Sequence, residues 1–391
     1  MNTEWIGKWK STSGLIAVVA LVAWAIGLAS NRGVAMQSYI YAFTVWGTLT
    51  FGCLGMTLLH HVTRARFSRP FLRIWEAGGG AAMILVFALL FLPIAANLSA
   101  IYPWADPKHV AEDKILQDKS LYLNPGFFIG RTVAYLAIWA LLAHLLRKSS
   151  LREDRTGAKS ETDFRANLSA PGIVAFMLTM TFAVTDWVMS LEPHWFSSIF
   201  GIWFGIQMAL TALAFATFFV LKNRDKDPFR EAVPAGTTKD AGTLLFAFTM
   251  FWGYITLSQF LIIYAANQPE TTEYYIVRSA NGWPTLMTLT AITQFFIPWL
   301  SLLAPRAKRT VWMLMTITAV ILLARFVDLY WIVMPAIRDH PAPLWTDLAA
   351  LAGIGGVWFT VFGWQLGKAP AIANHPPRTE EESEQEAVQH A

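Results

Sequence analysis

Long apolar runs, each about the length needed to cross a bilayer, alternate with polar segments along almost the whole chain. A transmembrane α-helix needs ~20 predominantly apolar residues. Windows of that length predict spans at residues 13–30, 37–61, 74–100, 124–147, 170–191, 196–221, 241–264, 281–303, 310–333 and 345–367. Of the connections, only 101–123 and 148–169 are long. The pattern therefore predicts an all-α polytopic membrane protein with ten transmembrane helices.

The polar segments also predict the orientation of the chain. Lys and Arg are concentrated in the N-terminal segment and in every second connection, and they are scarce in the others. By the positive-inside rule, both termini are expected in the cytoplasm. We expect one transmembrane domain over residues 1–368 and a disordered acidic tail over 369–391. The first span follows Lys8 and Lys10 and is long enough to be a retained signal anchor.

Composition supports this class and excludes others. Hydrophobic residues make up 55% of the chain and charged residues 14%, whereas about a quarter of a soluble domain is charged. The net charge is +4, but the basic residues are concentrated on one side of the predicted membrane, so the bilayer is an expected partner and nucleic acid is not. The single cysteine, Cys53, excludes an intrachain disulfide, a cysteine-held iron–sulfur cluster and covalent haem attachment.

Asp186 lies in an apolar part of the chain, in the stretch Thr185–Trp195, which we interpret as a hinge between two spans. A carboxylate at the centre of a membrane helix costs ~2.5–3.5 kcal/mol, so such residues face the bundle interior and mark a pathway or a charge pair. Asp186 is therefore the first candidate for a functional residue. The alternative is a buried carboxylate held by an Arg or by backbone donors only for packing.

The ninth span contains a second buried charge group. Arg325 and Asp328 are three residues apart, on one helix face, where they can pair with each other. Together with Arg131 and Asp186, at a similar depth in the outer half, they form a set with no net charge. A low-dielectric interior requires such a balance.

A third polar group lies near the cytoplasmic edge: His60 and His61 end the second span, Glu76 opens the third and His144 lies late in the fourth. Imidazoles and carboxylates exchange protons near neutral pH, so with Asp186 these residues could form a relay. For His60, His61 and Glu76 the alternative is a position at the membrane interface. His144, surrounded by Leu and Ala, is the stronger relay candidate.

Two further features concern the architecture. Asp186 precedes Pro193 by seven residues and Asp328 precedes Pro335 by seven, four spans later, which suggests two four-helix bundles (spans 2–5 and 6–9) flanked by spans 1 and 10. Residues 111–119 form an amphipathic stretch, expected to lie on the outer surface, to dock on a partner or to be a solvated loop.

Residues 185–197, residues 325–331 and the ten-span layout resemble the ActF-type subunits of bacterial alternative complex III, in the NrfD/PsrC-like family. The resemblance implies two four-helix bundles and a proton half-channel that depends on Asp186, Glu192, His194, Arg325 and Asp328. It implies a location in the bacterial inner membrane, no cofactor in this chain and no catalysis by it alone. Haem c and iron–sulfur clusters are expected in partner subunits, quinol in a paralogous ActC-like subunit, and electron delivery to cytochrome c or a terminal oxidase.

Two other classes remain open. A membrane cytochrome b would need paired imidazoles at one depth, for which only His60 or His61 with His144 qualify. A secondary transporter would need repeats with helices broken near the midplane, and only Pro93 and Pro298 lie well inside spans.

Overall fold

The computed structural model describes residues 4–227, 229–232 and 236–374, which are helical throughout apart from turns and short connections. Ten of its helices are long and apolar enough to cross a membrane, which confirms the predicted all-α polytopic class. The membrane-spanning elements are α1 (Glu4–Ser30), α2 (Arg32–Thr63), α3 (Arg69–Gly78) with α4 (Ala81–Ala95), α7 (Pro125–Thr156), α8 (Ser160–Trp187), α9 (Phe200–Lys222), α11 (Thr237–Ala266), α13 (Trp283–Thr290) continued by the π-helical η5 (Ala291–Phe296) and α14 (Ile297–Leu303), α16 (Val311–Val333) and α17 (Trp345–Leu366).

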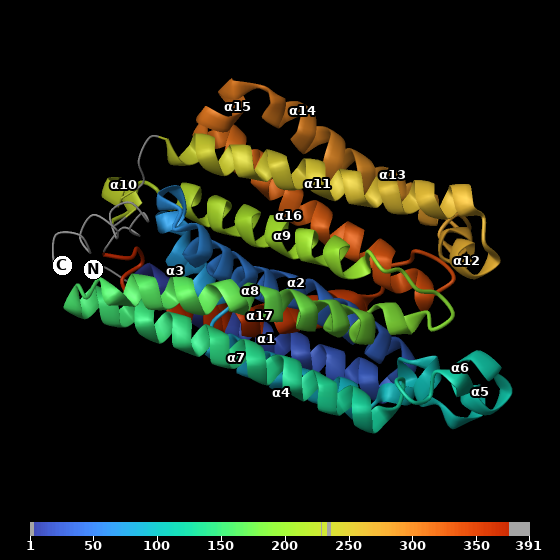
Figure 1. The fold of residues 1–391 in the computed structure, drawn as a ribbon. Coiled ribbons are helices and arrows are strands. Elements are labelled where there is room, and N and C mark those ends of the chain that lie inside the picture. Colours follow the sequence, from blue (N-terminus) through green and yellow to red (C-terminus); the bar gives the residue numbers. More distant parts are fainter. Residues whose placement is uncertain (1–3, 228, 233–235, 375–391) are drawn as a thin grey trace.

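Short helices cover the two ends of the bundle. They are η1 (Arg66–Ser68), η2 (Leu98–Ala100), η3 (Pro103–Ala105), α5 (Pro107–Glu112), α6 (Lys114–Asp118), η4 (Met189–Leu191), α10 (Phe229–Ala232), α12 (Pro269–Val277), α15 (Pro305–Arg309) and η6 (Met334–Ala336). We call the end that carries η1, α10 and α15 the basic end and the end that carries α5, α6 and α12 the opposite end (Figure 1).

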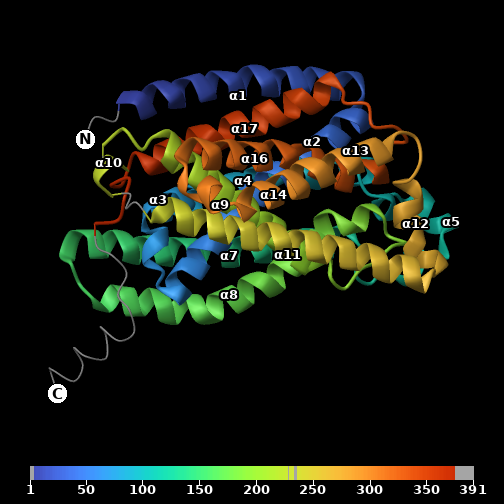
Figure 2. The same ribbon diagram turned by 90° about the horizontal axis from the view of Figure 1, so that it is seen from above.

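The spans form two bundles and a pair. Helices α2, α4, α7 and α8 pack together, and α9, α11, α13–α14 and α16 form a second group that joins the first through α2 and α9. Helices α1 and α17 pack along each other and against α2, on one side of the molecule (Figure 2). The predicted bundles of spans 2–5 and 6–9 are therefore present, and the two remaining spans form a pair.

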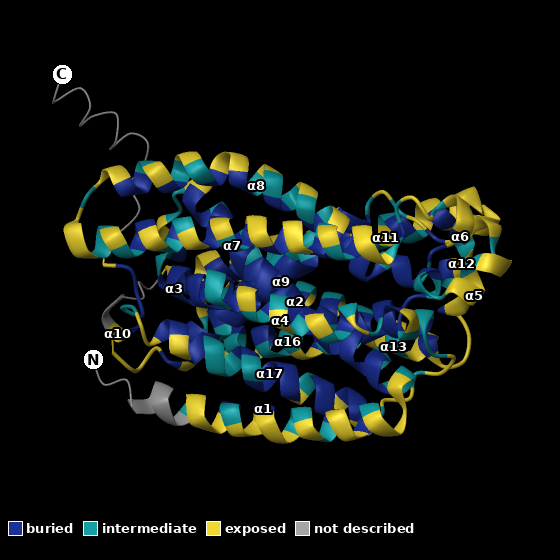
Figure 3. Cartoon of the chain, turned by 90° about the horizontal axis from the view of Figure 1, so that it is seen from below, coloured by how far each residue is buried: buried dark blue, intermediate teal, exposed yellow. Residues whose placement is uncertain are grey.

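Exposure separates the interior from a lipid-compatible surface. Large apolar side chains face outward along α1, for example Leu15, Val18 and Val22, while α2 is almost entirely buried between its neighbours (Figure 3). Apolar side chains on the outside of a membrane bundle meet lipid tails rather than water, so they carry no penalty there.

Asparagine caps begin two of the spans. The Asn31 side chain accepts a hydrogen bond from the Val34 N–H at 3.1 Å, and Asn31 alone separates α1 from α2. Asn124 accepts from the Phe127 N–H at 2.9 Å, and Pro125 follows at the first position of α7. These contacts satisfy N–H groups that have no partner within the helix, so the sequence specifies both starts locally.

The long connections differ from the prediction. Residues 148–169, expected as a connection, are helical except around Gly157, because α7 and α8 continue beyond the apolar runs. The predicted stretch 111–119 is split by Asp113 into α5 and α6, and Leu116 is buried against the chain itself.

The segment after α17 is ordered further than expected. Residues 371–373 are buried, and Arg69 donates to the backbone oxygens of Ala373 and Asn374 at 2.8 Å each. Residues 369–374 therefore pack on the basic end, which corrects the prediction of a disordered tail from residue 369. The remainder of that tail, 375–391, lies outside the described residues.

Candidate functional site

Asp186, one residue before the end of α8, has no exposed surface and is held by α7. Arg131 donates Nε to one carboxylate oxygen at 2.9 Å and Nη2 to the other at 2.8 Å. The Tyr135 hydroxyl donates to the same carboxylate at 3.0 Å. Bidentate Arg–carboxylate contacts are strong and geometrically specific. Asp186 therefore ties α8 to α7, and these contacts favour the packing alternative for this residue.

The other side of Arg131 is also occupied. Its Nη1 donates to the Tyr122 carbonyl at 3.0 Å, and its guanidinium lies 3.8 Å from the centre of the Tyr122 ring. The connection between α6 and α7 thereby covers the pair from the opposite end. Arg131 and Asp186 therefore pair with each other. The four charges predicted to form one set instead form two separate pairs, Arg131–Asp186 and Arg325–Asp328.

Arg325 and Asp328 form the second pair, within α16, as their spacing predicted. Both side chains are buried, at 2% exposure. The Gln294 amide, in the orientation that satisfies both of its polar atoms, accepts from Arg325 Nη2 at 2.9 Å and donates to the Ile321 carbonyl at 3.2 Å. Gln294 belongs to the π-helical turn η5, and π-turns occur frequently at functional sites because they redirect side chains.

A third pair joins the two bundles at the opposite end. Arg278, at the end of α12, donates Nη1 and Nη2 to the Glu192 carboxylate at 2.9 and 2.7 Å. It also donates to the Ile332 carbonyl of α16 at 2.7 Å. Arg278 is not among the candidate functional residues that the sequence indicates. The only available signal was an isolated basic residue on the side where basic residues are scarce.

Polar side chains continue inward from these pairs through the second bundle. They are buried and have atoms without a hydrogen-bond partner: both polar atoms of Gln207, Nε2 of Gln259, Nε of Arg325, and the hydroxyls of Thr217, Thr249 and Thr290. Gln207 lies one turn from Trp203, whose Nε1 donates to Thr256 of α11 at 2.9 Å, so this face of α9 is directed toward α11. We call these side chains, with Gln294 and Asp328, the polar row.

The depth of the polar row follows from helix geometry. At ~1.5 Å per residue, Gln207, Gln259 and Thr290 lie ~10 Å below the helix ends at the opposite end, and Thr217 and Thr249 lie ~25 Å below them. Buried polar atoms are rarely unpaired, and water is their usual additional partner in protein interiors. The unpaired groups of the row therefore lie at two depths, one nearer the opposite end and one beyond the middle of the bundle.

The first bundle has a different interior. Below Asp186, rings of Phe51, Trp139 and Trp187 pack with centroids 4.6 to 6.0 Å apart. The indole N–H groups are paired: Trp139 donates to Thr179 at 2.8 Å and Trp187 to Thr132 at 3.0 Å. This aromatic layer lies between Asp186 and the basic end, and the hydroxyls of Thr132 and Thr179 within it are paired with indole N–H groups.

Glu76 belongs to an ion-pair network at the basic end, and His60 and His61 are buried at the same end. His60 Nδ1 lies 2.6 Å from the Ser68 hydroxyl, and the His60 and His61 rings meet edge to face with centroids 5.0 Å apart. Arg73 pairs with both Glu76 and Asp154. The side chains of His60, His61, Arg73 and Glu76 are buried, and Arg73 links α3 to the end of α7 through Asp154.

His144 does not join this network. Its side chain is exposed on the outer face of α7, in a surface groove with Arg147 and Lys148. The structure therefore places His144 on the surface of the described chain and not in its interior, and its role in a relay stays a prediction. For the same reason it does not form an axial pair with His60 or His61, so the geometry gives no support to a cytochrome b.

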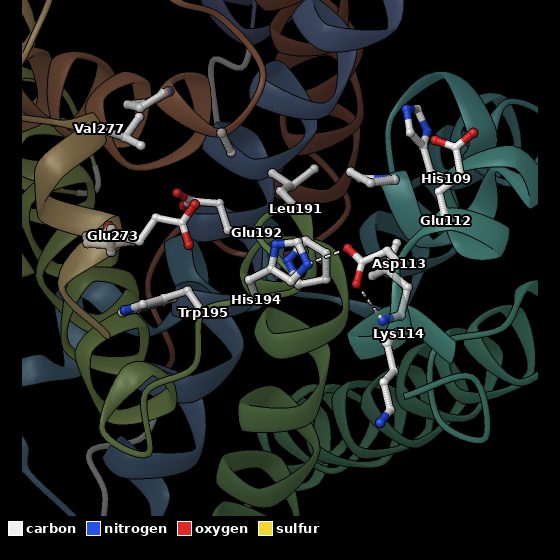
Figure 4. Close-up of a pocket in the computed structure, with 16 residues that line it drawn as sticks. His109, Glu112, Asp113, Lys114, Leu191, Glu192, His194, Trp195, Glu273 and Val277 are labelled. Atoms are coloured by element: carbon white, nitrogen blue, oxygen red, sulfur yellow. Dashed lines mark hydrogen bonds and ion pairs between the residues drawn. The ribbon is translucent and has the colours of Figure 1, made fainter. Parts of the chain in front are cut away.

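The opposite end carries a surface cavity of about 620 Å³, lined by residues of α5, α6, α12, η6 and the turn after η4. His194 Nε2 lies 2.5 Å from Asp113 Oδ2 across it (Figure 4). Desolvation works against the charged form of Asp113, but hydrogen bonds from His194 and the backbone N–H groups of Leu116 and Ile115 outweigh it and lower the pKa of this carboxyl. Glu192 lies at the floor of the cavity beside Tyr274.

The fold and these contacts define an all-α multi-pass membrane protein with ion pairs buried toward both ends of its bundle. Within that class, comparison adds nothing more specific: no protein-family model and no curated protein matches the chain. The function is therefore argued from the side chains and from the resemblance of residues 185–197 and 325–331.

Proposed function

We propose that this chain is a membrane subunit of a quinol-oxidising respiratory complex of the alternative complex III type, and that its second bundle is a proton half-channel. The partner subunits would carry haem c and iron–sulfur clusters, and quinol would bind in a paralogous membrane subunit. This chain would contribute a proton path and bind no redox cofactor itself.

The observation that carries the half-channel is the polar row. A proton path needs polar groups that can pass protons directly or through water, and intramembrane ionisable residues at its end. The row contains unpaired amide and hydroxyl groups at successive depths and includes Asp328 beside Arg325. In the first bundle, the rings of Phe51, Trp139 and Trp187 pack together in the corresponding region.

The entrance of this path would be the cavity at the opposite end. Its lining includes Glu192, His194 and Ala336, and Ala336 follows Asp328 by only eight residues on α16 and η6. Arg278 contacts Glu192 on the cavity side and the Ile332 carbonyl on the α16 side. Protons would therefore pass from the cavity beside the Glu192–Arg278 pair to Asp328.

The direct test is Asp328→Asn in the assembled complex, reconstituted in vesicles with a pH-sensitive dye. Asn keeps the shape but cannot exchange a proton, so proton movement per quinol should fall at least about tenfold, the range expected for loss of a positioned acid–base group. Haem content and subunit composition should be unchanged. Glu270→Gln, at an exposed position of α12, is the matched control.

Unchanged proton stoichiometry in D328N would remove Asp328 from the path and leave it a packing residue. A different outcome would overturn the assignment to a respiratory complex altogether: the chain purifies from its native membrane without haem-containing subunits. That result would favour the secondary transporter.

A further inference from the structure

A groove at the basic end is lined only by basic, apolar and neutral polar side chains. It has a volume of about 330 Å³ and lies between the start of α4, the last turns of α7 and the end of α17. Its cations are Arg147, Lys148, Arg155 and Lys368, and none of its lining residues carries a carboxylate. We call it the α4–α7–α17 groove.

Helix periodicity explains why the cations gather here. His144, Lys148, Leu151 and Arg155 are three or four residues apart, so α7 presents them on one face. Arg147 is held in place: Nη1 donates to the Gln365 Oε1 at 2.7 Å and Nη2 to the Gln365 carbonyl at 2.6 Å. The wall formed by α7 and α17 is therefore both basic and fixed.

The wall of the groove formed by α4 consists of small side chains. Helix α4 begins with Ala81 and Ala82, and Ala143 faces them from α7. Small side chains at these positions leave the groove open between neighbouring helices. On α17, Trp364 is 43% exposed and carries the Lys368 ammonium 3.5 Å from its ring centre. Tryptophan and lysine in this arrangement are typical of the level of the lipid headgroups.

The groove continues onto an apolar surface in the direction of the membrane middle. On α4, Leu85 and Leu89 lie one and two turns beyond Ala81 and are 60% and 66% exposed. On α7, Leu141 lies one turn beyond His144 and is 59% exposed. A ligand that fits both parts has an anionic head and long apolar chains.

We propose that the α4–α7–α17 groove is a binding site for one anionic phospholipid. Its phosphate would lie among Lys148, Arg155 and Lys368, with His144 as a further donor, and its acyl chains would follow Leu85 and Leu141. Basic pockets between membrane helices on the positively charged side bind such headgroups. A free phosphate ion would pair with the basic side chains but would not cover the exposed leucines.

The site is tested on the full-length chain in its native complex, purified in detergent and stripped of loosely bound lipid. Native mass spectrometry with added cardiolipin, phosphatidylglycerol or phosphatidylcholine measures the occupancy. The site variant is K148Q/R155Q/K368Q, and the matched control R306Q/K308Q/R309Q removes as many charges from α15 at the same end.

We expect saturable binding of one cardiolipin or phosphatidylglycerol molecule, weakened at least about tenfold in the site variant and less than about twofold in the control. Inorganic phosphate should not compete. Lys148, Arg155 and Lys368 are exposed, so the site variant should assemble normally. A second variant, Ala82→Phe, keeps every charge but fills the groove and should weaken binding as strongly.

Three results would overturn the proposal. Equal binding by the site variant and the control would make the attraction a general effect of surface charge. Equal binding of phosphatidylcholine would indicate ordinary surrounding lipid, and displacement by inorganic phosphate would indicate a site for a free anion.

Discussion

Arg278 and Glu192, separated by 86 residues in the chain, form a two-pronged ion pair that ties the turn after the first bundle to α12 and α16 of the second. Arg278 is 1% exposed and Glu192 20%. The Arg278 guanidinium also lies 3.4 Å from the centre of the Tyr274 ring. Arg278 therefore contacts the turn after η4, α12 and α16, and both Glu192 and Tyr274 line the cavity.

Glu192→Gln should destabilise the protein because it leaves the Arg278 charge buried without its counter-charge. Removing one partner of a buried pair costs ~3 kcal/mol or more. The measurement is thermal unfolding in detergent, with Arg306→Gln on exposed α15 as the control. If the two variants unfold at the same temperature, the pair does not hold the bundles together.

Asp186→Asn should likewise lower thermal stability, by ~3 kcal/mol, because Arg131 loses its charge partner while the aromatic layer below is unchanged. Adding Arg131→Gln should restore part of the loss, since the second substitution removes the uncompensated charge. A double-mutant cycle measures this coupling. Proton movement in the assembled complex should stay close to the wild-type value in D186N. A loss as large as that expected for D328N would return Asp186 to the path.

Gln294→Leu should interrupt the polar row beside Arg325, because it removes the Gln294 amide that accepts a hydrogen bond from Arg325. The substitution leaves a buried guanidinium N–H without its acceptor, which costs ~1–3 kcal/mol. We expect both a lower unfolding temperature and slower proton movement. Gln268→Leu, at an exposed position before α12, is the matched control. Normal proton movement in Q294L would exclude this part of the row from the path.

The His194–Asp113 contact should make the rim of the cavity sensitive to acid. The folded-state pKa of Asp113 is lowered, so the contact contributes stability that is present above the unfolded value of ~3.9 and is lost as pH falls through the folded value. Hydrogen exchange of α5 and α6, corrected for intrinsic rates, should therefore increase in acid.

Asp113→Asn is the informative variant for that measurement, because Asn also caps the start of α6 but does not titrate. Exchange in D113N should be faster than in the wild type at neutral pH and should show little further increase in acid. An identical acid response in both proteins would show that another group controls the rim.

Gly79 should be irreplaceable for a steric reason. It lies at the break between α3 and α4, where a Cβ would approach the Leu54 backbone nitrogen of α2 to 2.4 Å. Gly79→Ala should cost ~1–3 kcal/mol because one of the two helix backbones must move. Gly130→Ala is the matched control: no atom lies within 4 Å of its Cβ position, and alanine is the better helix former in α7. Equal stability of the two variants would contradict the close approach.

The sequence by itself determined the number and order of the spans, because an apolar segment long enough to cross the bilayer is most stable as a transmembrane helix. It also determined the Arg325–Asp328 pair, since a spacing of three places both residues on one helix face. The repeated distance from Asp186 to Pro193 and from Asp328 to Pro335 correctly indicated two bundles. All of these depend on positions close together in the chain.

Only the tertiary structure decided which charges meet across helices. The partners of Asp186 and Glu192 lie 55 and 86 residues away, and a local pattern does not specify which helix faces pack. The π-helical turn that directs Gln294 to Arg325 has no signature in the apolar pattern. His144 has the same apolar neighbours in sequence whether it faces inward or outward, and packing of α7 places it outside. Side-chain direction in an apolar span is set by its neighbouring helices, because every face of the helix is compatible with the membrane.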